Sequence, residues 1–172
     1  MDIIDIKHNE IQNASKPTLL QIFAFQKFLS TLEGYDFNQH LRHTFSQGSY
    51  ARELLLPKGL VIIGKVHRHA HLNIVSRGKV IVYTTDGLMQ IDATDHPVTF
   101  EGKPGTKRVI YALEDTVWTT IHLTESRDLK EIEDDIIIPE SNYQDLIDSI
   151  PDEFVFEVME NDMNKIDYEV TS

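Results

Sequence analysis

The feature that most constrains the fold is a series of short β-type segments between residues 45 and 122. Segments such as "KVIVY" and "LMQID" are rich in β-branched and apolar residues, and turn-forming groups such as "PKG", "SRG", "DHP" and "GKPG" separate them. The stretch Thr84-Thr85-Asp86-Gly87 lies between two of these segments and predicts a hairpin. Many short strands at this spacing are typical of an all-β antiparallel sandwich or barrel.

Helical patterns flank this β-rich region. The segment "KPTLLQIFAFQKFLSTLE" repeats apolar residues with a helical period and predicts a helix over residues 16–33, packed on the main body. Further short helices are expected near residues 126–134 and within "NYQDLIDSI". We therefore expect three parts: an N-terminal arm and helix (1–44), a barrel (45–124) and an acidic, partly helical extension (125–172).

The net charge of −12 lies almost entirely in the C-terminal extension, which holds 16 acidic residues against three basic ones. This imbalance disfavours binding to nucleic acid, which requires neutralised phosphates. The extension is expected either to be solvated or to dock as an arm in a homo-oligomer, a dimer or larger. No membrane-length apolar run, secretory signal or cysteine occurs, so we expect a cytoplasmic protein that does not bind membranes.

Three histidines spaced two residues apart stand in "GKVHRHAHLNIVSRGKV", residues 64–80. Residues two apart on a strand share a face, which here predicts a common side for Lys65, His67, His69, His71 and Asn73. Imidazoles on one strand can bind a divalent metal if another strand completes the set, and His122 in "TVWTTIHLTE" is the first candidate. Such a set favours Zn, Fe, Mn or Ni. The alternative is hydrogen-bonded barrel histidines without a metal.

The spacing of glycines and histidines around this stretch resembles the first motif of the cupin family of small jelly-roll β-barrels. That motif is Gly, five residues, His-x-His, three or four residues, Glu, six residues and Gly. Here Gly59 and Gly78 frame the same spacing, with Lys65 at the first histidine position, His67 at the second and His71 at the glutamate position. In the looser second motif, "KPGTKRVIYA" places Arg108 where the family has a histidine. The resemblance covers about residues 45–123 and implies a cupin-type jelly roll in which His67 and His71 hold a metal.

More narrowly, "GKVHRHAHLNIVSRGKVIV" and "PGTKRVIYALEDTVWTTIHLTE" are similar to the cupin-like proteins of tailed bacteriophages and prophages. The resemblance implies a phage-type cupin in the host cytoplasm, with virion association as an alternative. We expect it to bind a divalent metal and a small molecule in the barrel; if it is an enzyme, its reaction is metal-dependent. The alternative class is a non-catalytic binding protein or a virion-associated scaffold.

The departures from the family pattern indicate an anionic ligand. Lys65 and Arg108 occupy positions that point into the barrel in the family, and an ammonium and a guanidinium there favour an anion. We expect Lys65, Arg108 and Tyr111 to bind a carboxylate, sulfate, phosphate or nucleotide-like group. The alternative is that Lys65 turns outward and Arg108 pairs with Glu114 or Glu53.

Overall fold

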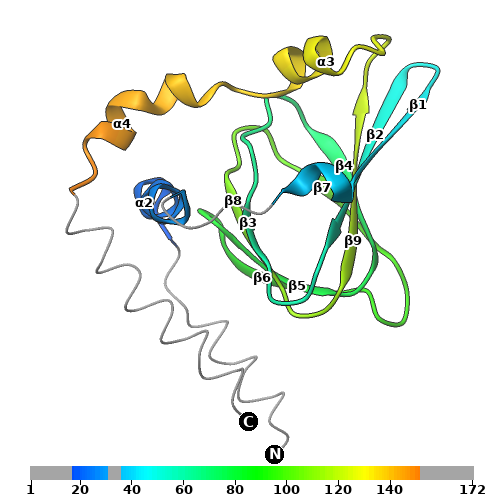
Figure 1. Ribbon diagram of the computed structural model, residues 1–172, viewed down its shortest axis with the longest axis horizontal. Helices are drawn as coiled ribbons and strands as arrows, with labels where there is room; N and C mark the ends of the chain where they lie inside the picture. Colours follow the sequence, from blue (N-terminus) through cyan, green and yellow to red (C-terminus); the bar gives the residue numbers. More distant parts are fainter. Residues whose placement is uncertain (1–16, 31–35, 152–172) are drawn as a thin grey trace, which may run out of the picture. The chain divides into compact units, whose positions relative to one another are not determined.

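The structure is a computed structural model that describes residues 17–30 and 36–151 (Figure 1). The chain divides into two units, one of residues 1–17 and 36–139 and the other of residues 18–35 and 140–172. The first unit contains the two β-sheets and the second contains helices. Within the described residues, no helix combines the length and apolar character needed to cross a membrane.

The first unit is built from two antiparallel sheets (Figure 1). Its strands are β1 (Leu41–Ser46), β2 (Ser49–Leu56), β3 (Val61–Ile63), β4 (His71–Arg77), β5 (Lys79–Thr84), β6 (Gly87–Asp92), β7 (Val98–Gly102), β8 (Arg108–Ala112) and β9 (Thr116–Leu123). The orders are β1-β2-β9-β4-β7 and β3-β8-β5-β6. Apart from the added β1, this is the eight-stranded pattern of a jelly roll. The all-β antiparallel jelly roll expected from the sequence is confirmed.

Alternation along the strands positions the core. In β4, His71, Asn73 and Val75 are buried, whereas Leu72 between them is 49% exposed. The central apolar cluster draws on both sheets, and its buried members are Leu56, Val75, Val80, Val82, Ile91, Ala93, Ile110, Ala112 and Trp118. The predicted hairpin is also present, since β5 and β6 pair from Thr84 and Gly87.

Gly78, the last glycine of the histidine frame, is required by the backbone. It follows an irregularity in the pairing of β4 with β9 and has φ +93°, a conformation that L side chains rarely adopt. A Cβ at this position would also lie 2.5 Å from the carbonyl oxygen of Asp115. The glycine therefore permits a close approach of two backbones where β4 turns into β5.

A short helix, α3 (Leu129–Ile136), packs against the barrel. The Asp128 side chain caps its N-terminus by accepting from the amides of Lys130 and Glu131. Ile132 and Ile136 are 1% and 3% exposed and form a second apolar cluster with Tyr50 of β2. After the helix, the amide of Ile138 donates to the carbonyl of Val66 at 2.9 Å. The helix expected near residues 126–134 is therefore present, displaced by about one turn.

The second unit is helical. The helix predicted over residues 16–33 is present as α2 (Leu19–Leu29), which begins after Thr18 in a capping box with Gln21. The short helices η2 (Glu140–Tyr143) and α4 (Gln144–Asp148) correspond to the expected "NYQDLIDSI" helix. Phe23 and Ala24 of α2 form a small core with Ile150. A further short helix, η1 (Phe37–His40), precedes β1 in the first unit.

Candidate metal centre

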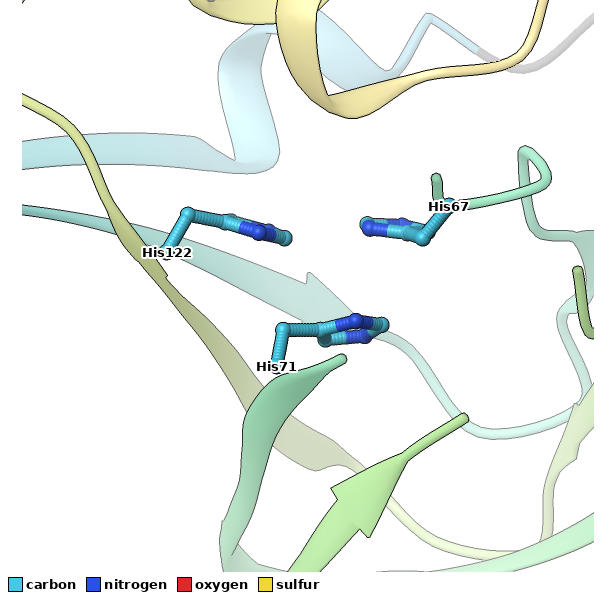
Figure 2. Close-up of side chains that lie close together, drawn as sticks. All are labelled: His67, His71 and His122. Atoms are coloured by element: carbon cyan, nitrogen blue, oxygen red, sulfur yellow. The ribbon is translucent and has the colours of Figure 1, made fainter. Parts of the chain in front are cut away.

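Three histidine rings converge at one end of the barrel interior (Figure 2). His67 comes from the connection between β3 and β4, His71 begins β4, and His122 lies near the end of β9. The ring centroids are 4.1 Å apart for His67 and His71, 4.9 Å for His71 and His122, and 5.0 Å for His67 and His122. Each ring offers a nitrogen within 4.8 Å of the other two. The structure therefore brings together three of the four predicted metal ligands.

Local backbone contacts fix where these rings lie. His71 is opposite Gly102 of β7, and a Cβ on Gly102 would lie 2.5 Å from Nε2 of His71, so the missing side chain makes room for the ring. The carbonyl of His67 accepts from the amide of Gly105 at 2.9 Å, and His67 forms a single bridge with Ile137 after α3. Two loops thus hold His67, whereas His71 and His122 are held by strands.

One nitrogen of each ring is buried without a hydrogen-bond partner among the described residues: Nδ1 of His67, Nε2 of His71 and Nε2 of His122. Nδ1 of His71 lies 3.2 Å from the carbonyl oxygen of His69, which can only accept, so this nitrogen carries the proton. Nε2 of the neutral His71 ring is then unprotonated and carries a lone pair. Buried polar atoms without partners are rare and costly, and three that converge fit a bound cation.

Burial keeps these rings neutral. Loss of hydration, followed by the charges of His71 and His122, lowers the pKa of His67 to about 2. Burial and then the charge of His71 lower the pKa of His122 to about 4. Burial is also the largest cause that lowers the pKa of His71. Neutral imidazoles at physiological pH offer the lone pairs that a metal needs.

The spacing of the nitrogens is close to what an ion requires. A tetrahedral ion with metal–nitrogen bonds of about 2.1 Å holds its ligand nitrogens about 3.4 Å apart, compared with the largest observed separation of 4.8 Å. The residues therefore fit a transition-metal ion in donor type, protonation state and position.

The expectation that alternate residues from Lys65 to Asn73 share one face is wrong for the first half of the segment. Residues 64–70 do not form a continuous strand; they include a single bridge at His67 and a bend, and β4 begins only at His71. His69 lies outside the cluster, is 57% exposed and approaches Asp135 at 3.9 Å. Lys65 is 49% exposed and forms an ion pair with Glu133 of α3.

A cavity of about 320 Å³ adjoins the histidines. Its lining includes Phe37, Leu41, Arg52, Leu54, Leu56, Ile62, Ile63, Gly64, Lys65, His67, Arg108, Ile110, Trp118 and Thr120. Lys65 and Arg108, two of the three predicted ligand-binding residues, are thus on the cavity wall. Tyr111, the third, is not among the lining residues, because it alternates with Ile110 on β8 and faces the other side of the sheet.

Arg108 does not form either of the pairs considered as alternatives from the sequence. Glu53 pairs with Arg42 at 3.3 Å, and the guanidinium of Arg108 has neither an ion pair nor a hydrogen bond among the described residues. Burial lowers the pKa of its guanidinium.

Arg52 lines the cavity and was missed by the sequence analysis. The available signal was its alternation with Tyr50, Leu54 and Leu56 along one strand.

Comparisons with known proteins give a limited result. No protein-family profile matches the sequence, and no curated protein matches it. Similar solved structures include a cupin-2 domain protein from Shewanella frigidimarina, with 12% identity over 58% of this chain and 92% of that chain and a TM-score of 0.41. KdgF from Halomonas sp. has 17% identity over 58% of this chain and 93% of that chain, with a TM-score of 0.41. The cupin domain of Cnp3 from Schizosaccharomyces pombe has 15% identity over 59% of this chain and 70% of that chain, with a TM-score of 0.42. The fold assignment above rests on the strand order, and these likenesses carry nothing about ligands.

Proposed function

We propose that this chain binds a divalent transition metal through His67, His71 and His122. The observation that carries this proposal is the convergence of three histidine rings, each of which offers a nitrogen within 4.8 Å of the other two. Each ring also has one buried nitrogen without a hydrogen-bond partner among the described residues. Imidazole nitrogen favours Zn, Fe, Mn or Ni over Mg and Ca, which prefer oxygen. The hydrogen bond from Nδ1 of His71 to the carbonyl of His69 supports the proposal, because ligating histidines commonly donate their second nitrogen in this way.

We further propose that a small molecule occupies the adjoining cavity. His67 belongs both to the histidine cluster and to the cavity wall. Three protein ligands leave a coordination position open, as in catalytic metal sites. When bound, such an ion supplies a Lewis acid that can polarise an oxygen of a molecule in the cavity. The protein's own contribution is to hold the rings, to exclude water with the apolar wall and to place positive side chains beside the site.

A non-catalytic anion-binding role is the second candidate. Of the described residues that line the cavity, Arg52, Lys65 and Arg108 are basic and none is acidic, which favours a negatively charged ligand. This role and metal binding can coexist, because a metal-bound anion would use both sets of residues. A site that takes up anions but no metal would support the second candidate alone.

The biological setting remains a further proposal. The similarity of "GKVHRHAHLNIVSRGKVIV" to phage and prophage cupin-like proteins supports a phage-type protein in the host cytoplasm or on a virion.

We also propose that the chain forms a homo-oligomer. Light scattering coupled to size-exclusion chromatography tests this assembly, and a mass of 19.8 kDa across the micromolar range would contradict it.

Metal content tests the proposed function directly. The protein is purified without a metal-affinity step, and its transition metals are measured by elemental analysis before and after zinc titration. We expect about one equivalent per chain, and at least a tenfold loss of affinity in His71→Ala and His122→Ala. His69→Ala is the matched control, because this histidine lies in the same segment but outside the cluster. The absence of stoichiometric uptake by the unmodified protein would overturn the proposal.

A further inference from the structure

The inner face of the first sheet is arranged in three rows across its strands. The registers pair Tyr50 with His122, Arg52 with Thr120 and Leu54 with Trp118, and they pair Thr120 with Asn73 and Trp118 with Val75. A histidine row with His71 and His122 is therefore followed by a polar row of Arg52, Thr120 and Asn73. The third row, of Leu54, Trp118 and Val75, is apolar. Along the strands, the residues that face the interior therefore change from histidines to polar and then to apolar side chains.

The polar row holds hydrogen-bonding groups that no described residue satisfies. Asn73 is fully buried, and its Oδ1 accepts from Nε1 of Trp118 at 3.0 Å. Since the indole nitrogen can only donate, this bond fixes the orientation of the amide. The amide nitrogen Nδ2, a donor, is then buried without a partner, as is Oγ1 of the facing Thr120. A buried donor of this kind needs an acceptor.

Two arginines, Arg52 and Arg108, line the cavity, whereas Asn73 does not. The guanidinium group of neither arginine forms an ion pair or a hydrogen bond with a described residue. A Cβ on Gly102 would lie 2.7 Å from Nη2 of Arg108 and 2.5 Å from Nε2 of His71, so this guanidinium lies beside the histidine row. Among the described residues, no carboxylate lines the cavity to balance these charges. A ligand that carries a negative charge would balance them.

The rest of the wall is apolar. Beyond the polar row the cavity is lined by aliphatic and aromatic side chains, among them Leu54, Leu56, Ile62, Ile110 and Trp118. A fully polar anion such as phosphate would satisfy the arginines but would leave this surface in contact with water. A ligand with an anionic head and an apolar body fills both parts.

We propose that the cavity binds an amphipathic carboxylate. Its carboxylate group lies among Arg52, Arg108 and Thr120, and its apolar body packs against Leu54, Ile110 and Trp118. This inference rests on the proposed function, because both assign a small molecule to the same cavity. It requires no bound metal.

Calorimetric titration of the metal-free, full-length protein tests this proposal without any substitution. The probes are octanoate, octanamide, which has the same body without the charge, and acetate, which has the same head without the body. We expect octanoate to bind at least about tenfold more tightly than either control. Octanamide lacks the charged contact, and acetate lacks the buried methylenes, and each loss is large enough to cause this difference. No binding of octanoate, or equal binding of octanoate and octanamide, would overturn the proposal. Equal binding of octanoate and acetate would overturn the apolar part and with it the ligand class.

Two arginine variants locate the binding site. Arg52→Gln and Arg108→Gln should each weaken octanoate binding at least about tenfold and should leave octanamide unchanged. Arg77→Gln is the matched control, because Arg77 is exposed and does not line the cavity. Near-ultraviolet circular dichroism confirms that each variant is folded, and octanoate binding unchanged in both folded variants would overturn the assignment.

Zinc uptake measured on the same preparations separates the two proposals. Octanoate binding without zinc uptake would contradict the metal site and leave the carboxylate site supported. Zinc uptake without octanoate binding would overturn the carboxylate site and leave the metal site supported.

Discussion

At the scale of single residues, the site depends on one absent side chain. Gly102 lies opposite His71, and the ring of His71 and the guanidinium of Arg108 both occupy space that a Cβ on this glycine would fill. The proposed metal ligand His71 and the proposed anion-binding Arg108 therefore meet at the same point of the backbone. A methyl group at Gly102 therefore tests how the packing positions both side chains.

Gly102→Ala should weaken zinc binding at least about tenfold and lower the free energy of unfolding by about 1–3 kcal/mol, because the methyl group overpacks the site. Calorimetry with zinc and urea denaturation followed by fluorescence measure the two effects. Gly64→Ala is the control, since the nearest atoms to a Cβ there are at an ordinary 3.8 Å. Unchanged zinc affinity in Gly102→Ala would show that this packing does not position His71.

At the scale of elements, α3 holds the histidine end of the barrel through apolar packing more than through charge. Ile132 is 1% exposed and packs in one cluster with Tyr50 of β2, the residue paired with His122. By contrast, the ion pair between Lys65 and Glu133 is about half exposed. Exposed ion pairs contribute little to stability.

Substitutions on α3 should therefore differ in their effects. Ile132→Ala should lower the free energy of unfolding by about 2–5 kcal/mol, whereas Glu133→Gln should change it by less than about 1 kcal/mol. The fluorescence of Trp118, the sole tryptophan of the chain, reports unfolding of the barrel in urea. A larger effect of Glu133→Gln than of Ile132→Ala would reverse this account of the helix.

The elements differed in how far the sequence could predict them. The hairpin at Thr84–Gly87 and the burial of His71 follow from turn chemistry and alternation, which are local properties. The spacing from Gly59 to Gly78 selected His67 and His71, whose rings the structure brings together. The alternation failed for Lys65 and His69, because it applies only to a strand, and contacts with the segment after α3 hold residues 64–70 in another conformation.

The remaining parts of the site depend on long-range pairing that one sequence does not encode locally. His122 could be proposed as a ligand, but its direction follows only from the pairing of β9 with β2 and β4. Arg52 reaches the cavity through the same pairing, opposite Thr120. The orientation of the Asn73 amide is fixed by its hydrogen bond with Trp118, which is 45 residues away in the sequence.

At the scale of the whole molecule, buried neutral histidines couple folding to pH. The pKa of His122 is lowered from 6.5 to about 4 in the folded protein. Between these values the unfolded chain binds a proton that the folded chain does not, so stability falls as the pH is lowered below 6.5. The same direction applies to His67, whose pKa is lowered to about 2.

The metal-free protein should consequently be less stable at about pH 5 than at neutral pH, with His122 contributing up to about 2 kcal/mol of the difference. Urea denaturation followed by Trp118 fluorescence at several pH values measures it. His122→Gln should flatten the pH dependence, and the exposed His96→Gln should leave it unchanged. A pH dependence in His122→Gln equal to that of the unmodified protein would contradict the assignment of the proton uptake.

The central claim is that one transition-metal ion is held by His67, His71 and His122. Anomalous diffraction at the zinc edge, from crystals of the protein saturated with zinc, tests it most directly. The account predicts a single strong peak per chain at about 2.0–2.1 Å from Nδ1 of His67, Nε2 of His71 and Nε2 of His122. No peak among these three nitrogens, or a single peak between His69 and Asp135 instead, would contradict it.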